Sequence, residues 1–323
     1  MSGTAQSGRG RVVALCGGVG GAKLALGLQQ VLGPRLSVVV NMADDFEHLG
    51  LRISPDLDTV LYTLGGLSDR QRGWGRAGES WHFMEALAEV GGETWFSLGD
   101  RDLALHVERT RRLAAGQTLT AIAADIARRF GIAAQIRPVS NDDIRTIVVT
   151  PDEELAFQRY FVERRCEPTV RRIRFEGADT ARLTREVRDA LAPRDLRMVV
   201  ICPSNPFLSI DPLFAVSGLR ELLAAAGVPI VAVSPIVGGQ AVKGPTRKIM
   251  DELGVAATTA AIAKHYEGLI SGIVIDSGDV AEADGLALPV HATPTLMTDL
   301  ASKVALARQT LAFGDRLAAQ ADR

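Results

Sequence analysis

The chain has 323 residues, of which 47% are hydrophobic, and a formal net charge of −2 at pH 7. This length fits one large α/β domain with an insertion, or two smaller domains. The near-neutral charge gives no electrostatic argument for nucleic acid or a membrane surface as a partner, and no apolar run approaches the ~18 residues of a membrane span. Three cysteines without C-x-x-C spacing provide neither a disulfide framework nor a structural zinc site. We therefore expect a soluble, reduced, cytoplasmic protein in which residues 1–10 form a disordered polar tail.

The first predicted elements are a strand, a glycine-rich turn and a helix. Residues 11–16 are a short apolar run typical of a buried strand, and residues 23–32 have a helical pattern. The turn between them contains Gly18, Gly20 and Gly21. Glycines let backbone N–H groups approach a ligand closely, and the N-terminus of the following helix favours phosphate. We therefore expect phosphate to bind at this turn; the alternative is a tight turn that binds nothing.

Two standard nucleotide-binding motifs are absent from this turn. The dinucleotide fingerprint needs a third glycine at the position of Lys23, and the P-loop needs Gly-Lys-Ser/Thr. A nicotinamide-dependent oxidoreductase is therefore disfavoured, although Asp44 stands near the position of the ribose-binding acid. Binding of NAD(P)H in a fluorescence titration would support the oxidoreductase interpretation.

The remaining elements predict a doubly wound, mostly parallel, Rossmann-like α/β sheet with a mainly helical insertion. Further buried strands are predicted at residues 36–41, 198–202, 229–234 and 272–276, with helices at 212–226, 245–253 and 298–317. The insertion covers residues 71–167 and has helical patterns at 80–90, 102–115 and 119–130. The nucleotide-binding core would then comprise residues 11–70 and 168–323.

Polar or glycine-rich segments follow four of the predicted strands. They are residues 17–21, 42–47, 203–206 and 234–239. Because ligands of open α/β sheets bind at the carboxyl ends of the strands, we expect these segments to converge on one cleft.

Four aspartates lie within fifteen positions beside the glycine-rich turn: Asp44, Asp45, Asp56 and Asp58. An aspartate at 56 or 58 can cap the helix that begins there, but one cap does not explain four carboxylates. Magnesium binds through one or two carboxylates together with substrate phosphates. We therefore interpret the cluster as a magnesium site.

Two turns contain further candidate ligand-binding groups. Arg101 lies in a Gly-Asp-Arg-Asp turn that opens a helix, where its planar fork could bind phosphate or a polar ring edge. Ser204 and Asn205 lie between two prolines after a strand and offer a hydroxyl and an amide to a nucleotide. Either set could instead be structural: a surface ion pair for Arg101, and closure of the turn for Ser204 and Asn205.

Taken together, these segments resemble the 2-phospho-L-lactate transferase family of deazaflavin coenzyme biosynthesis. The resemblance rests on Gly-Gly-Val-Gly-Gly-Ala-Lys at 17–23, Asn-Met-Ala-Asp-Asp at 41–45, Pro-Asp-Leu-Asp-Thr at 55–59, Gly-Asp-Arg-Asp at 99–102, Pro-Ser-Asn-Pro at 203–206, Ser-Pro-Ile-Val-Gly at 234–238 and Leu-Met-Thr at 296–298. It implies transfer of a phospho-three-carbon-acid unit from a guanosine-diphosphate-linked donor to the ribityl hydroxyl of 7,8-didemethyl-8-hydroxy-5-deazariboflavin (FO). The products would be coenzyme F(420)-0, or a variant of it, and GMP, with Mg²⁺ as the cofactor. The donor unit is left open among 2-phospho-L-lactate, phosphoenolpyruvate and 3-phosphoglycerate.

The resemblance also implies roles for individual residues. Asp58 and Arg101 match positions that contact the deazaflavin acceptor, and Asp45 and Asp58 are the candidate catalytic carboxylates. Asp44, Asp45 and Asp58 are the candidate magnesium ligands. The glycine-rich turn with Lys23 would face the donor phosphates, and Ser204 with Asn205 the guanosine. The oligomeric state is left open, with a homodimer as one possibility.

A non-catalytic relative is the main alternative. The gluconeogenesis factor family shares the fold, the glycine-rich opening and the acidic pair, but binds a sugar nucleotide as a regulator. It continues with a glycine- and serine-rich segment, whereas this chain continues with Phe-Glu-His-Leu-Gly at 46–50 and Pro-Asp-Leu-Asp-Thr. The transferase is therefore the preferred interpretation.

Overall fold

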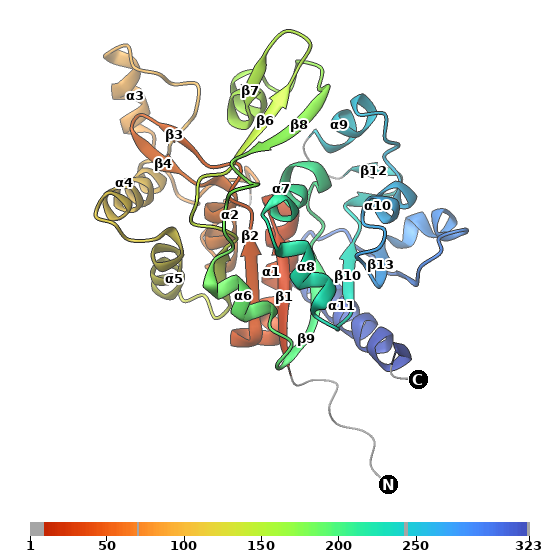
Figure 1. Ribbon diagram of the computed structural model, residues 1–323. Coiled ribbons are helices and arrows are strands. Elements are labelled where there is room, and N and C mark those ends of the chain that lie inside the picture. Colours follow the sequence, from red (N-terminus) through yellow and green to blue (C-terminus); the bar gives the residue numbers. More distant parts are fainter. Residues whose placement is uncertain (1–9, 70, 242–244, 322–323) are drawn as a thin grey trace.

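The computed structural model describes residues 10–69, 71–241 and 245–321, and its centre is a seven-stranded sheet in which all neighbouring strands are parallel (Figure 1). The strand order is β14-β13-β10-β9-β1-β2-β5. The strands are β1 (Arg11–Cys16), β2 (Leu36–Val40), β5 (Gln135–Pro138), β9 (Leu196–Ile201), β10 (Ile230–Val233), β13 (Gly272–Ile275) and β14 (Val290–Ala292). The inner strands are short apolar runs that are almost completely buried, as expected for a parallel sheet covered on both faces. The predicted α/β class is confirmed.

The strand order contains the switch point of a doubly wound fold. From β1 the chain proceeds to β2 and β5 on one side, then crosses to β9 and continues through β10, β13 and β14 on the other. The connections that follow β1 and β9 therefore leave the sheet side by side, in opposite directions. A crevice forms between such connections, and this is where ligands of doubly wound folds bind.

Helices cover both faces of the sheet. In Figure 1, α6 (Arg185–Leu191) and α8 (Leu219–Ala225) lie in front of it, while α1 (Gly18–Leu32) and α11 (Leu300–Ala321) lie behind. Helix α1 packs closely on α11 and on α2 (Pro55–Leu64). The remaining helices of the second half are α7 (Asp211–Ala215), α9 (Thr246–Glu252) and α10 (Thr259–His265). Within the described residues, no helix has both the length and the apolar character needed to cross a membrane.

The middle of the chain contains the three predicted helices, and also strands that the sequence analysis missed. The helices are α3 (His82–Glu89), α4 (Asp100–Ala114) and α5 (Leu119–Arg129). After them, β5 joins the edge of the central sheet beside β2. A separate antiparallel sheet follows, made of β6 (Arg145–Val149), β7 (Glu154–Ala156) and β8 (Arg172–Glu176). A hairpin of β3 (Phe46–His48) and β4 (Leu51–Ile53) was also missed.

Several predicted boundaries shift for local reasons. Helix α1 begins at Gly18, five residues before the prediction, so the glycine-rich segment forms its first turn. The single helix predicted over 212–226 is two, because Val216 is extended and Gly218 has a φ of +88°. Residues 1–9 of the predicted tail lie outside the described residues.

Candidate active site

A cavity of about 630 Å³ opens at the carboxyl ends of the strands, at the switch point between β1 and β9. Its lining includes residues from each of the four segments predicted to converge: Gly17–Gly20, Asp44, Pro203–Asn205, and Ser234, Pro235 and Val237. Residues of α2 and the aromatic side chains of the middle segment complete it. The prediction of one shared cleft is therefore confirmed.

The glycine-rich turn and the turn after β9 are in direct contact. Ser204 is 4% exposed, and its hydroxyl donates to the Gly17 carbonyl over 2.7 Å and accepts from the Gly17 N–H over 3.3 Å. A Cβ at Gly20 would collide with the carbonyl oxygen of Pro203, and one at Gly21 with the Ser204 hydroxyl. These glycines are thus required for the close packing of the two turns, in addition to any ligand contact. Gly21 is not among the residues that line the cavity.

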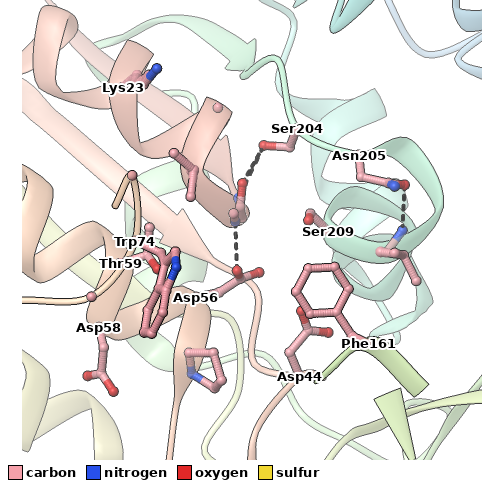
Figure 2. A pocket seen from close by; sticks show the side chains of 18 of the residues that line it. Lys23, Asp44, Asp56, Asp58, Thr59, Trp74, Phe161, Ser204, Asn205 and Ser209 are labelled. Atoms are coloured by element: carbon pink, nitrogen blue, oxygen red, sulfur yellow. Dashed lines mark hydrogen bonds between the residues drawn. The ribbon is translucent and has the colours of Figure 1, made fainter. Parts of the chain in front are cut away.

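Asp56 stabilises the N-terminus of α1. Its carboxylate accepts from the Gly18 N–H over 2.7 Å and from the Asn41 amide over 2.9 Å (Figure 2). The side chain lines the cavity, and burial raises the pKa of its carboxyl to about 6. The sequence analysis placed Asp56 in the acidic cluster but did not select it as a site residue. Nothing in the sequence near Asp56 indicated that it would cap a helix that lies far from it in the chain.

The adjacent aspartates Asp44 and Asp45 face different surroundings. Asp44 lines the cavity, and burial together with the nearby Asp56 carboxylate raises its pKa well above the ordinary value. Asp45 does not line the cavity: it accepts from the Ser54 hydroxyl over 2.6 Å and lies 3.5 Å from the Arg52 guanidinium. Burial raises the pKa of Asp45 to about 7. The structure therefore separates the two carboxylates that the sequence analysis grouped.

Asp58 belongs to a second polar cluster, at another edge of the cavity. Its carboxylate forms a two-pronged ion pair with Arg109, whose guanidinium is completely buried. His106 lies between Asp58 and Asp102, with its Nδ1 3.7 Å from one carboxylate and its Nε2 3.3 Å from the other. The Tyr62 hydroxyl donates to Asp102. In Figure 2 the Asp58 carboxylate points away from Asp44 and Asp56.

Arg109 and His106 were missed by the sequence analysis. They lie on one face of α4, at positions i+7 and i+4 from Asp102. That spacing was readable as one helical face. Nothing in the sequence indicated that the face would be buried against α2, so an arginine and a histidine there had the appearance of solvated residues.

The other predicted ligand contacts are located as follows. Lys23 lines the cavity, and its ammonium donates to the Met297 carbonyl over 3.2 Å. Asn205 also lines it, but its side-chain oxygen caps the helical turn Pro206–Ile210, and its amide donates to the Thr246 hydroxyl over 3.0 Å. Asn205 thus has the structural function that the sequence analysis gave as the alternative.

Arg101 does not line the cavity. It is exposed on the first turn of α4, and its guanidinium lies against Gly78. Its carbonyl oxygen accepts from Arg76 over 3.3 Å, and its N–H donates to the Glu79 carboxylate over 2.7 Å. Arg101 therefore supports the loop before α3, and its contact with an acceptor stays a prediction of the resemblance.

The fold and the cavity define a doubly wound α/β protein with a ligand site at its switch point, where a helix N-terminus meets buried carboxylates. Comparison with known proteins is more specific. The chain belongs to the 2-phospho-L-lactate transferase CofD family, whose model matches residues 12–291. It is therefore a member of a transferase family.

Curated relatives match almost the whole chain. A protein of Streptomyces griseus named phosphoenolpyruvate transferase is 40% identical over 319 residues, which are 96% of this chain and all of that protein. Proteins of the same name from Kitasatospora aureofaciens and a Mycobacterium species are 39% and 38% identical, over 95% and 92% of this chain and 98% and 97% of theirs. Among solved structures, a UPF0052 family protein from Bacillus halodurans has a TM-score of 0.60 at 15% identity, covering 94% of this chain and 99% of that one. At that identity the structural likeness concerns the fold alone.

Proposed function

We propose that this protein transfers a phosphoenolpyruvyl unit from its guanosine-diphosphate-linked form to the ribityl hydroxyl of FO, releasing GMP, in the biosynthesis of coenzyme F(420). The observation that carries the proposal is the full-length similarity to relatives named phosphoenolpyruvate transferase. In this chain, the glycine-rich turn and buried aspartates that line one cavity support it. Those names favour phosphoenolpyruvate over phospholactate and phosphoglycerate as the three-carbon unit. In the reaction, the FO hydroxyl oxygen bonds to the phosphorus nearest the three-carbon unit while the bond from that phosphorus to GMP breaks.

The donor diphosphate would bind at the N-terminus of α1. Gly18 and Gly20 line the cavity there, and Lys23 projects into it from the next turn (Figure 2). Peptide N–H groups and the helix dipole favour a phosphate at this end of a helix. Ser204 and Asn205 also line the cavity, and the guanosine would lie beside them.

Magnesium fits between Asp44 and Asp56. Both carboxylates are buried and both line the cavity, and the Asp56 carboxylate contributes to the raised pKa of Asp44. A divalent cation with phosphate and water ligands would balance this charge. When bound, the ion would neutralise the phosphate oxygens of the donor. Of the other predicted ligands, Asp45 does not line the cavity, and the charge of Asp58 is already balanced by the Arg109 guanidinium.

We assign to Asp58 the orientation of the attacking hydroxyl. Its ion pair with Arg109 fixes the carboxylate at the cavity edge, and Thr59 lines the cavity beside it. A hydrogen bond from the FO hydroxyl to Asp58 would direct the hydroxyl oxygen toward the phosphate. Positioning and charge neutralisation account for most of the catalysis of phosphoryl transfer.

The test is a turnover assay with mass spectrometric detection. Purified protein is incubated with FO, Mg²⁺ and each of the three guanosine-diphosphate-linked donors. The expected result is a phosphodiester of FO with release of GMP, fastest with the phosphoenolpyruvyl donor. Retention of nucleotide without any product would contradict the proposal and favour a regulatory protein of the gluconeogenesis factor type.

A further inference from the structure

A short 3₁₀ helix after β13 carries carboxylates at regular intervals. The helix covers Ser277–Ala283, and Asp276 caps its N-terminus by accepting from the Gly278 N–H over 2.9 Å. Acidic residues recur at every third position, as Asp276, Asp279 and Glu282. Because a 3₁₀ helix has three residues per turn, side chains three positions apart lie above one another. The three carboxylates therefore lie along one side of the helix.

Asp276 fixes one segment of the cavity wall. One of its carboxylate oxygens accepts from both the N–H and the hydroxyl of Thr295, over 2.7 Å and 3.1 Å. Thr295 and Met297 line the cavity, and the Met297 carbonyl accepts from the Lys23 ammonium. Burial raises the pKa of Asp276, but its hydrogen bonds outweigh this effect, so that the pKa lies below its ordinary value. The wall segment is therefore held at one end by an ionised carboxylate and at the other by Lys23.

Asp279 fixes a second segment. Gly238 and Gly239 form a two-residue hairpin turn, with φ values of +59° and +68°. The Asp279 carboxylate is 3% exposed and accepts from the Gly238 N–H over 3.0 Å and from the Gly239 N–H over 2.7 Å. Val237, directly before the turn, lines the cavity. Asp279 thus determines where the turn after β10 lies relative to the cavity.

Glu282 forms the same kind of hydrogen bond away from the cavity. Its carboxylate accepts from the Thr259 N–H over 2.7 Å, at the start of α10. Neither Glu282 nor Thr259 lines the cavity. Asp276 and Asp279 do not line it either, so they can act on a ligand only through the backbone that they hold.

The two segments at the cavity depend on these individual hydrogen bonds. Residues 293–298 form neither helix nor strand, and Thr295 is buried, so without Asp276 its N–H group would lack a partner. The N–H groups of the two central residues of a hairpin turn have no partner within the hairpin. Segments stabilised by few hydrogen bonds open more easily than a core strand does. Loss of either aspartate should therefore loosen one segment of the cavity wall.

We infer that Asp276 and Asp279 are positioning residues for the donor nucleotide, which hold the segments after β14 and β10 in the conformation that binds it. This inference rests on the proposed function, because it takes the ligand to be the guanosine-diphosphate-linked donor. The contact between Lys23 and Met297 places one of these segments beside the N-terminal part of α1, where the donor phosphates would bind. A preorganised wall binds more tightly because less conformational entropy is lost on binding.

The test measures nucleotide binding separately from turnover. The full-length protein is titrated with GDP by isothermal titration calorimetry, with Mg²⁺ and without FO. For Asp279→Asn we expect the GDP Kd to rise about tenfold, because asparagine keeps one acceptor oxygen and turns its amide toward the second N–H group. In steady-state kinetics the donor KM should rise likewise, while kcat and the KM for FO change little.

Asp276→Asn is the second variant. Asparagine is a good helix N-cap, so the 3₁₀ helix keeps its start while the charge that holds Thr295 is removed. Its GDP Kd should rise as well. Hydrogen exchange then identifies the cause: amide exchange should be faster over residues 293–297 in Asp276→Asn and over residues 234–239 in Asp279→Asn.

Glu282→Gln is the matched control, since it removes a carboxylate of the same helix that accepts from a backbone N–H remote from the cavity. It should lower stability in urea by an amount comparable to that of the aspartate variants and leave the GDP Kd unchanged. Wild-type GDP affinity in both aspartate variants, or an equal loss in Glu282→Gln, would overturn the inference. If the wild type binds GDP with these variant effects but forms no product with any donor, the transferase proposal fails and the positioning function stands.

Discussion

Arg109 and Asp58 form an ion pair whose two members have different surroundings: the guanidinium is completely buried, while the carboxylate reaches the cavity. Burial of a charge is tolerated only with a partner, so removal of one member leaves the other uncompensated. The ion pair thereby fixes the orientation of the Asp58 carboxylate, and Arg109 opposes the rise in its pKa that burial causes. Burying the arginine is unfavourable in itself, but its ion pair prevents the Asp58 carboxylate from rotating away from the site.

Arg109→Met should therefore destabilise the fold by about 3 kcal/mol, because Asp58 is left as an unpaired buried charge. The double variant Asp58→Asn/Arg109→Met removes both charges and should recover much of that loss in a urea titration. It should nevertheless lack activity, since no carboxylate remains to orient the acceptor hydroxyl. Full activity in the double variant would show that Asp58 has only a structural function.

Asp44 and Asp45 offer a matched pair for the magnesium site. Asp44→Asn removes a carboxylate that lines the cavity, whereas Asp45→Asn removes one held by Ser54 and Arg52. Ligands that bind the native state raise the melting temperature. We expect the Mg²⁺-dependent rise in Tm, measured with GDP present, to be lost in Asp44→Asn and kept in Asp45→Asn. The reverse pattern would assign the metal to Asp45.

At the scale of elements, helix α1 needs glycine at two positions, where different neighbours approach its backbone closely. Near its N-terminus, Gly20 lets the turn after β9 approach; further along, Gly27 lets the backbone of α11 approach at Lys303. An added methyl group at either position collides with a carbonyl oxygen. Only the first collision lies at the cavity.

Gly20→Ala and Gly27→Ala should accordingly both lower stability, by about 1–3 kcal/mol each, as overpacked sites do. Only Gly20→Ala should also raise the KM of the donor, because it shifts the two turns that flank the switch point. Urea denaturation and steady-state kinetics on both variants separate the two effects. A similar donor KM change in Gly27→Ala would mean that the position of the whole helix, and not the turn, sets donor binding.

The elements of the core could be predicted because their signals are local. Apolar runs such as that of β1, and the glycines after it, predicted the doubly wound sheet and the convergence of four loops. The strand β5 was missed because Gln-Ile-Arg-Pro has no apolar run: it is an edge strand, recognisable only by its pairing with β2. Strands β7 and β8 were missed because they are short and contain arginine or glutamate, whereas the apolar run of β6 was a signal that the sequence analysis overlooked.

The candidate site was predicted in composition more than in arrangement. The sequence analysis grouped four aspartates, but long-range partners divide them: Gly18 and Asn41 bind Asp56, and Arg109 binds Asp58. Those partners lie on other elements, so no spacing in the sequence could indicate them. Trp74, which lines the cavity, was overlooked for a similar reason, since an exposed tryptophan in a glycine-rich loop becomes informative only when a cavity is seen beside it.

At the scale of the whole molecule, the cavity lies where three packing units meet. Tyr62 belongs to the main core, Phe157 to the small core beneath β6, and Phe96 to an aromatic cluster with Phe46, His48 and Trp95. All three units contribute to the cavity lining. A ligand that contacts all of them would hold the units together, so binding and global stability should be coupled.

The aromatic cluster makes the molecule sensitive to acid through His48. This imidazole is 4% exposed, and burial lowers its pKa below the ordinary 6.5, against a weaker opposing effect of Glu93. A histidine whose pKa is lowered by folding binds a proton more readily when unfolded. Its contribution to stability is therefore complete above about pH 6.5 and is lost as the pH falls toward the folded-state pKa.

His48→Phe keeps the aromatic contacts and removes the titration. Relative to wild type, the variant should become more stable as the pH is lowered from about 7.5 to about 5. In this range, protonation of His48 favours the unfolded state of the wild type, and the variant has no such group. Titrations in urea at both pH values give this difference directly, and the buried aspartates, which are common to both proteins, cancel from it. His82→Phe is the control for loss of an imidazole at the surface, since the His82 side chain is 80% exposed. A pH-independent difference for His48→Phe would mean that the cluster admits the imidazolium without cost, and that acid sensitivity arises elsewhere in the chain.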